Sequence, residues 1–136
     1  MHRGTALALV AVFVLPGSAR SEPIAAADQA AIHAVITDQI DAFRRDDWDA
    51  AYGFASPGIR TLYPTVDSFA EMITHNYQPV YRPQSVVFGE VIEASQGPVQ
   101  RVYVTGPDGS AYVANYAMRR DADGKWTITS SQRVRA

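Results

Sequence analysis

The sequence predicts an α+β domain in which helices come first and pack on one face of a curved antiparallel sheet of about four strands. Up to residue 76, apolar residues recur at steps of three and four, which is typical of amphipathic helices. After residue 84 they recur at steps of two, which is typical of half-buried strands. The turn sequences 106–109 (GPDG) and 121–124 (DADG) divide this second part into hairpins.

The longest predicted helix covers residues 27–45. Its apolar stripe consists of Ile32, Val35, Ile36, Ile40 and Phe43. Asp28 lies in the first turn, where negative charge is favoured, and Arg44 and Arg45 lie in the last turn, where positive charge is favoured.

Two further helices are predicted, at residues 48–55 and 66–76. Asp47 and Thr65 stand at their N-cap positions. We interpret 56–58 (SPG) as the end of the first of these helices. The segment 77–83 (YQPVYRP) contains two prolines, so we expect it to leave the helical conformation and lead into the sheet. The predicted strands are 86–92, 99–105, 112–118 and 126–130.

The N-terminus has the pattern of a secretory signal peptide. A basic start at His2 and Arg3 precedes an apolar run from about residue 5 to 15, and small residues follow. That run is about half the roughly 20 residues that a membrane-spanning helix needs, so we expect cleavage and no stable membrane insertion. We therefore predict a signal peptide at 1–21, a domain at 22–136, and secretion, with the bacterial periplasm as the expected location.

Charge and composition exclude several classes of function. Removing Arg3 and Arg20 with residues 1–21 lowers the Lys and Arg count from 12 to 10, against 14 Asp and Glu. A mildly acidic chain has no electrostatic footprint for nucleic acid. The sequence has no cysteine, which excludes thiol chemistry, and its 3 histidines show no zinc-site spacing. We predict no metal and no cofactor.

Many residues across 39–128 resemble the bacterial family called domain of unknown function 4864. They include 41–44 (DAFR), 54–57 (FASP), Tyr77, 79–80 (PV), 82–83 (RP), 104–109 (VTGPDG) and 123–128 (DGKWTI). Such proteins are similar in architecture to the nuclear transport factor 2-like, or SnoaL-like, superfamily. The resemblance implies a cone-shaped fold with a cavity at its wide end, and it implies no activity. Where it leads us to expect Gly-Cys, this chain has Ser130-Ser131.

An isomerase-like or dehydratase-like enzyme needs an acidic or histidine base that faces a pocket, together with a tyrosine donor. Tyrosines are present, but a base is hard to place. The helical period puts Asp38 beside the stripe of the first helix and Asp41 opposite it. His33 lies on the flank of that helix, and His75 lies opposite the stripe of the 66–76 helix. The enzyme alternative would use Asp46 or Asp38. If Asp46 is not catalytic, we expect its carboxylate to pair with Arg44 or Arg45.

Gln39 falls inside the apolar stripe, where its amide needs hydrogen-bond partners in the fold or in a ligand. We predict a secreted, non-enzymatic module that binds a small apolar or aromatic molecule or a protein partner. Its pocket would be bounded by Gln39, Phe43, Trp48, Tyr52, Tyr63, Tyr112, Tyr116 and Trp126. A further alternative is a structural domain that dimerises through its open sheet face.

Overall fold

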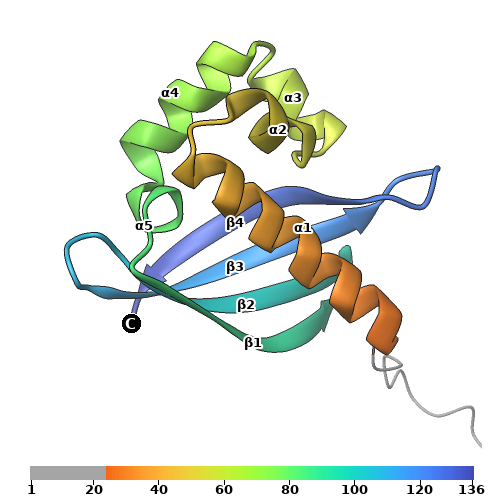
Figure 1. Ribbon diagram of the computed structural model, residues 1–136. Coiled ribbons are helices and arrows are strands. Elements are labelled where there is room, and N and C mark those ends of the chain that lie inside the picture. Colours follow the sequence, from red (N-terminus) through yellow and green to blue (C-terminus); the bar gives the residue numbers. More distant parts are fainter. Residues whose placement is uncertain (1–23) are drawn as a thin grey trace, which may run out of the picture.

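A computed structural model describes residues 24–136, so the predicted signal peptide at 1–21 lies outside the described residues. Five helices precede four strands (Figure 1). The helices are α1 (Ala26–Arg44), α2 (Trp48–Gly53), α3 (Pro57–Leu62), α4 (Val66–Asn76) and α5 (Gln78–Tyr81). The strands are β1 (Ser85–Ala94), β2 (Gly97–Thr105), β3 (Ala111–Arg120) and β4 (Trp126–Arg135). The predicted α+β class is confirmed.

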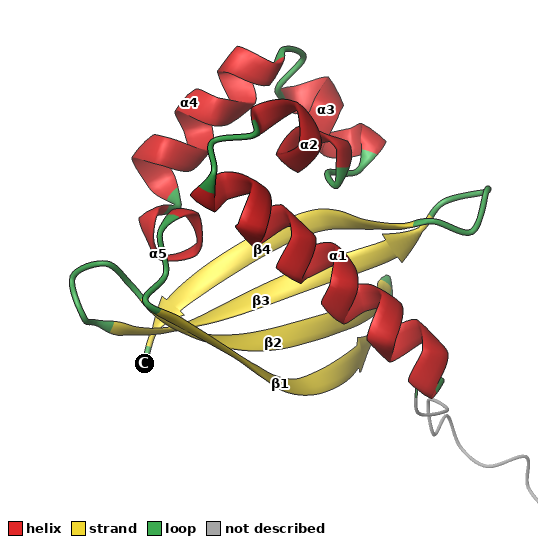
Figure 2. Ribbon diagram, in the orientation of Figure 1, coloured by secondary structure: helices red, strands yellow, loops and turns green. Residues whose placement is uncertain are grey.

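The strands form one antiparallel sheet in the order β1-β2-β3-β4. The helices lie together on one face of it, with α1 crossing the sheet and α2, α3 and α4 gathered near the end of α1 (Figure 2). In β1 the register shifts between Phe88 and Val91. The carbonyl of Gly89, inside this irregular stretch, accepts a hydrogen bond from Gln100 Nε2 at 2.9 Å. A buried side chain therefore replaces a ladder bond that the bulge removes.

The core lies between the helices and the inner face of the sheet. From α1 it takes the predicted stripe residues Ile32, Ile36, Ile40 and Phe43, all of which are buried. From the sheet it takes Val102, Val104, Ala114, Tyr116, Met118 and Ile128. Burying each large apolar side chain contributes about 1.5–3 kcal/mol, so this contact surface is what holds α1 on the sheet.

The predicted helix caps are confirmed. Asp47 accepts a hydrogen bond from Ala50 N at 3.2 Å, and Thr65 and Ser68 form a reciprocal capping box at the start of α4. These side chains satisfy backbone amides that have no partner within the first helical turn.

Two interpretations of the helical region were wrong. The 56–58 segment does not only end a helix: the Ser56 side chain accepts from Ile59 N at 3.3 Å and begins α3, with Pro57 in its first turn. The 77–83 segment likewise contains the short helix α5, with Pro79 near its start. Proline has no amide to donate, but the first helical turn requires none, so both prolines initiate helices.

The corner after α1 is held by Asp46, which has a positive φ of 52°. Its carboxylate accepts from the Tyr81 hydroxyl and from Arg82 Nη2, the latter at 2.9 Å. The expected partners, Arg44 and Arg45, instead lie near Asp41 and Asp47. The partner of Asp46 therefore comes from the end of α5, which the linear sequence places far away.

Candidate functional site

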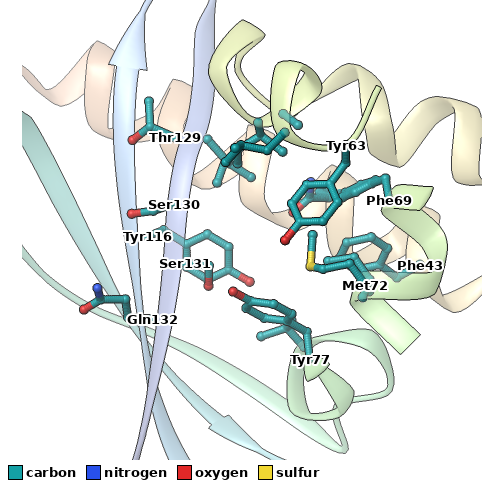
Figure 3. Close-up of a pocket in the computed structure, with 17 residues that line it drawn as sticks. Phe43, Tyr63, Phe69, Met72, Tyr77, Tyr116, Thr129, Ser130, Ser131 and Gln132 are labelled. Atoms are coloured by element: carbon teal, nitrogen blue, oxygen red, sulfur yellow. The ribbon is translucent and has the colours of Figure 1, made fainter. Parts of the chain in front are cut away.

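A cavity of about 290 Å³ lies between the helical layer and strands β3 and β4 (Figure 3). This volume lies just below the range of roughly 300–1,000 Å³ that is typical of small-molecule sites. The lining residues are Gln39, Phe43, Ala55, Ile59, Leu62, Tyr63, Phe69, Met72, Ile73, Tyr77, Val80, Tyr116, Ile128, Thr129, Ser130, Ser131 and Gln132. Every helix except α2 contributes at least one of them.

The helical walls of the cavity are mostly apolar. The stripe of α4 supplies Phe69, Met72 and Ile73, because helical spacing turns all three toward the sheet. Phe43 approaches from α1, and its ring centroid lies 6.3 Å from that of Phe69. These walls would hold an apolar body through contact and exclusion of water.

The opposite wall follows the edge of the sheet. Five consecutive residues of β4, Ile128 to Gln132, line the cavity. Successive side chains of a strand point to opposite faces, so a space that touches all five must meet the edge of the strand. β4 is the last strand of the sheet, and Ile128 pairs its backbone there with Phe54 and Ser56. The cavity thus opens just beyond this short stretch of pairing.

Two buried hydroxyl groups in this wall lack hydrogen bonds. Tyr116 is 1% exposed, yet its Oη has no partner among residues 24–136, and the same holds for Ser131 Oγ. These two residues face each other across β3 and β4 in the sheet register. Figure 3 shows both hydroxyls, together with that of Tyr77, turned toward the same part of the cavity. Unpartnered buried hydroxyls are costly, which makes them candidate contacts for a ligand or a water molecule.

The Tyr116 phenol stays protonated in this environment. Burial raises the pKa of Tyr116 above its ordinary value because a phenolate would lose its hydration. The Ser131 hydroxyl is close enough to oppose part of that rise, although the two groups do not have the geometry of a hydrogen bond. The neutral hydroxyl can therefore donate one hydrogen bond and accept others across the physiological pH range.

The Gln39 amide is used within the fold. Gln39 is 5% exposed, and its Nε2 donates to the carbonyl of Ala51 at 3.1 Å, which ties α1 to α2. Because Gln39 also lines the cavity, its side chain serves both the architecture and the wall of the site.

The structure brings together four of the eight predicted pocket residues. Gln39, Phe43, Tyr63 and Tyr116 line the cavity. Tyr52 is not in the lining. Its hydroxyl instead donates to the backbone carbonyl of Tyr63 at 2.6 Å. The side chain therefore supports the position of Tyr63 and does not face the cavity itself.

The other three predicted residues pack elsewhere. Trp48 stacks on Tyr81 with ring centroids 5.5 Å apart. The guanidinium of Arg120 lies 5.4 Å from the centroid of the Trp126 ring, and that of Arg135 lies 6.0 Å from the centroid of the Tyr112 ring. Along the paired strands β3 and β4, Tyr112 and Trp126 lie at opposite ends. The cavity lies beside the middle of this pair, at Tyr116 and Ser131.

Sequence reasoning missed Phe69, Met72 and Tyr77 on the helical side and Thr129–Gln132 on the strand side. The apolar spacing of residues 66–76 predicts a helix with one buried stripe, and such a stripe does not by itself distinguish a core face from a cavity wall. Ser131 did carry a signal, since Ser130-Ser131 is where this chain departs from the pattern expected of the family.

The bases that the enzyme alternative requires lie outside the cavity. Its lining contains no Asp, Glu or His. Asp38 is exposed on α1, and Asp46 is exposed and paired with Arg82. His33 stacks on Phe88 at 4.1 Å and contacts Gln100 Oε1 at 2.9 Å, so its ring is engaged over the sheet.

Within residues 24–136, no group of His, Cys, Asp or Glu side chains has the arrangement needed to hold a metal ion. None of the helices in this range combines the length and apolarity that crossing a membrane requires.

The fold and the site define an α+β domain in which helices cover one face of an antiparallel sheet and leave a lined cavity at its edge. The chain belongs to the family described as domain of unknown function (DUF4864), whose sequence model matches residues 25–136. Searches among curated proteins and among solved structures gave no match. The likeness to the nuclear transport factor 2-like superfamily therefore stays a prediction.

Proposed function

We propose that this protein is a non-enzymatic module that binds a small apolar or aromatic molecule in the cavity between its helices and β4. The observation that carries the proposal is a cavity of about 290 Å³ with apolar helical walls and two buried hydroxyls that have no partner in the described chain. This combination of an apolar lining with a few convergent polar groups is typical of ligand sites.

Binding is favoured over isomerase or dehydratase chemistry by the composition of the wall. Such reactions need a general base within hydrogen-bond reach of the substrate. The lining supplies hydroxyl and amide groups, and these are poor proton acceptors.

A neutral fluorescent probe, N-phenyl-1-naphthylamine, tests the proposal directly. We expect saturable binding by the wild-type protein with one site per chain. Met72→Trp should abolish it by filling the cavity, whereas Val87→Trp, on an exposed position of β1, should leave it unchanged. Absence of saturable binding to the folded wild-type protein, or equal binding by Met72→Trp, would contradict the proposal.

We also propose that the protein is exported to the periplasm, on the basis of the signal-peptide pattern in residues 1–21. N-terminal sequencing of the protein from a periplasmic fraction tests this. The expected result is a mature chain that begins after Ala19 or Ser21, and an intact N-terminus in the cytoplasmic fraction would contradict it.

A second candidate function, homodimerisation, is favoured by an apolar row on the outer face of the sheet. Val87, Tyr103, Val113 and Val134 are successive partners across the four strands. Val87 and Val134 are 59% and 58% exposed. Covering this row with a second copy would remove apolar surface from water.

Sedimentation velocity of the wild type and of a Val87→Lys, Val134→Lys double variant tests the dimer. We expect a dimer that the double variant converts to a monomer, while Leu62→Lys, at another exposed apolar position, has no effect. A wild-type protein that is monomeric at high concentration would refute this second candidate.

A further inference from the structure

We propose that the ligand of the cavity is a neutral molecule that carries a carbonyl oxygen, and that this oxygen accepts hydrogen bonds from the hydroxyls of Tyr116 and Ser131. The inference rests on the proposed function, since it assigns a ligand class to the same cavity. It starts from the two buried hydroxyls that find no partner among the residues the structure describes.

The ligand is neutral because the cavity offers nothing to balance a charge. None of its lining residues is Lys, Arg, His, Asp or Glu. A buried ion without a partner costs far more than a buried neutral polar group. Arg133 comes close, with its guanidinium 4.4 Å from the centroid of the Tyr77 ring, but it is exposed and does not line the cavity.

The polar group of the ligand is an acceptor because each of the two hydroxyls has a proton to donate and neither has an acceptor among residues 24–136. Burial keeps the Tyr116 phenol protonated by raising its pKa, and the Ser131 hydroxyl also carries a proton. Both side chains come from the inner face at one register position, Tyr116 opposite Ser131. A carbonyl oxygen has two lone pairs, so one oxygen can accept from both groups.

The rest of the ligand is apolar and extends toward the helices. Phe43, Phe69 and Met72 face the hydroxyl pair from the other side of the cavity (Figure 3). Aromatic rings and a thioether make favourable contacts with an aromatic body. The expected class is therefore a small aryl or alkyl ketone, aldehyde, ester or amide.

Three probes of matched shape separate the possibilities: naphthalene, 2-acetylnaphthalene and 2-naphthoate. Their affinities for the folded protein are measured at pH 7.5 by displacement of N-phenyl-1-naphthylamine. We expect the ketone to bind about tenfold more tightly than the hydrocarbon, as one or two net hydrogen bonds allow, and the anion to bind most weakly.

The outcomes distinguish the inference from the function on which it rests. Naphthalene binding as tightly as the ketone, or naphthoate binding most tightly, would overturn the carbonyl assignment and leave the binding function standing. Failure of N-phenyl-1-naphthylamine and all three probes to bind would overturn both.

Variants locate the interaction. Tyr116→Phe and Ser131→Ala should each reduce the affinity for 2-acetylnaphthalene by about threefold to tenfold and leave the affinity for naphthalene unchanged. Tyr112→Phe is the matched control, because Tyr112 lies on the same strand and face but outside the cavity. Equal losses for the ketone and the hydrocarbon would show that the hydroxyls act through packing, which would overturn the assignment.

Discussion

Arg82 Nη2 lies 2.9 Å from Asp46 Oδ1, and this ion pair joins the end of α5 to the corner that follows α1. The same arginine also donates to the carbonyl of Phe43, one of the last residues of α1. Arg82 therefore binds two groups at this corner: the carboxylate of Asp46, which has a positive φ, and the carbonyl of Phe43 near the end of α1. This contact ties the end of α5 to the corner from which the chain continues into α2.

Replacement of Asp46 by Asn should reduce stability in a pH-dependent way. The hydrogen bond from Tyr81, followed by that from Arg82, lowers the pKa of Asp46. A lowered pKa in the folded state contributes stability above the unfolded-state value of about 3.9, and that stability is lost as the pH falls through the folded value. Asparagine tolerates positive φ, so the variant removes the charge without straining the corner.

Urea denaturation between pH 3 and pH 7 measures this effect. Wild type should be more stable than Asp46→Asn at pH 7, and the two curves should converge toward pH 3. Asp38→Asn, at an exposed position on α1, is the control. A gap between wild type and Asp46→Asn that stays constant over this range would contradict the assignment.

Replacement of Ser56 by Ala should destabilise the protein by about 1 kcal/mol, the usual cost of removing an N-cap. The Ser56 side chain accepts from Ile59 N at the start of α3, and it is buried. Thermal denaturation should show a decrease in melting temperature of about 4 °C. Ser130→Ala, at an exposed serine, should change it little. An unchanged melting temperature for Ser56→Ala would mean that another group caps α3.

Replacement of Gln100 by Leu should cost about 2 kcal/mol or more. Gln100 is fully buried, and its Nε2 donates to the carbonyls of Gly89 and Arg101 at 2.9 and 2.8 Å. Leucine would leave these carbonyls, and the ring of His33, without their partner. Guanidinium denaturation measures the loss, with the turn variant Gln96→Leu as control. Full stability in Gln100→Leu would show that water reaches the bulge.

Replacement of Tyr116 by Phe should make the ligand-free protein more stable, by about 0.5–1 kcal/mol. The variant keeps the buried ring and removes a hydroxyl that has no partner in the described chain. Tyr112→Phe, at a half-buried position, should stay within about 0.5 kcal/mol of wild type. A loss of stability in Tyr116→Phe, measured by urea denaturation, would mean that an ordered water already binds the hydroxyl.

The main elements of the fold could be predicted from the sequence because their periods are clear. The stripe from Ile32 to Phe43 predicted α1, and the change from a period near 3.6 to a period of 2 predicted the order of helices and strands. Helices α3 and α5 were missed because Pro57 and Pro79 are equally compatible with ending and with starting a helix.

The candidate site was harder to predict, because an aromatic residue can pack in many ways. Trp48 lies on the predicted apolar face of its helix, but it stacks on Tyr81, which comes from a segment that we expected to leave the helical conformation. Tyr112 and Tyr116 share a face of β3, and only the position of the helical layer decides that Tyr116 alone meets the cavity. The lining from β4 depends on a sheet edge, which a linear pattern does not reveal.

The use of a strand edge as a wall has a consequence for the divergence of the family. Thr129, Ser130 and Gln132 touch the cavity without belonging to the buried core. Substitutions at these positions can change the shape and polarity of the wall while the contacts between α1 and the sheet stay intact. On this strand the cavity wall can therefore vary separately from folding stability, whereas Phe43, Phe69 and Tyr116 belong to the core as well as to the lining. If the proposed binding function holds, relatives could come to differ in ligand through a few substitutions on β4 that leave the core unchanged.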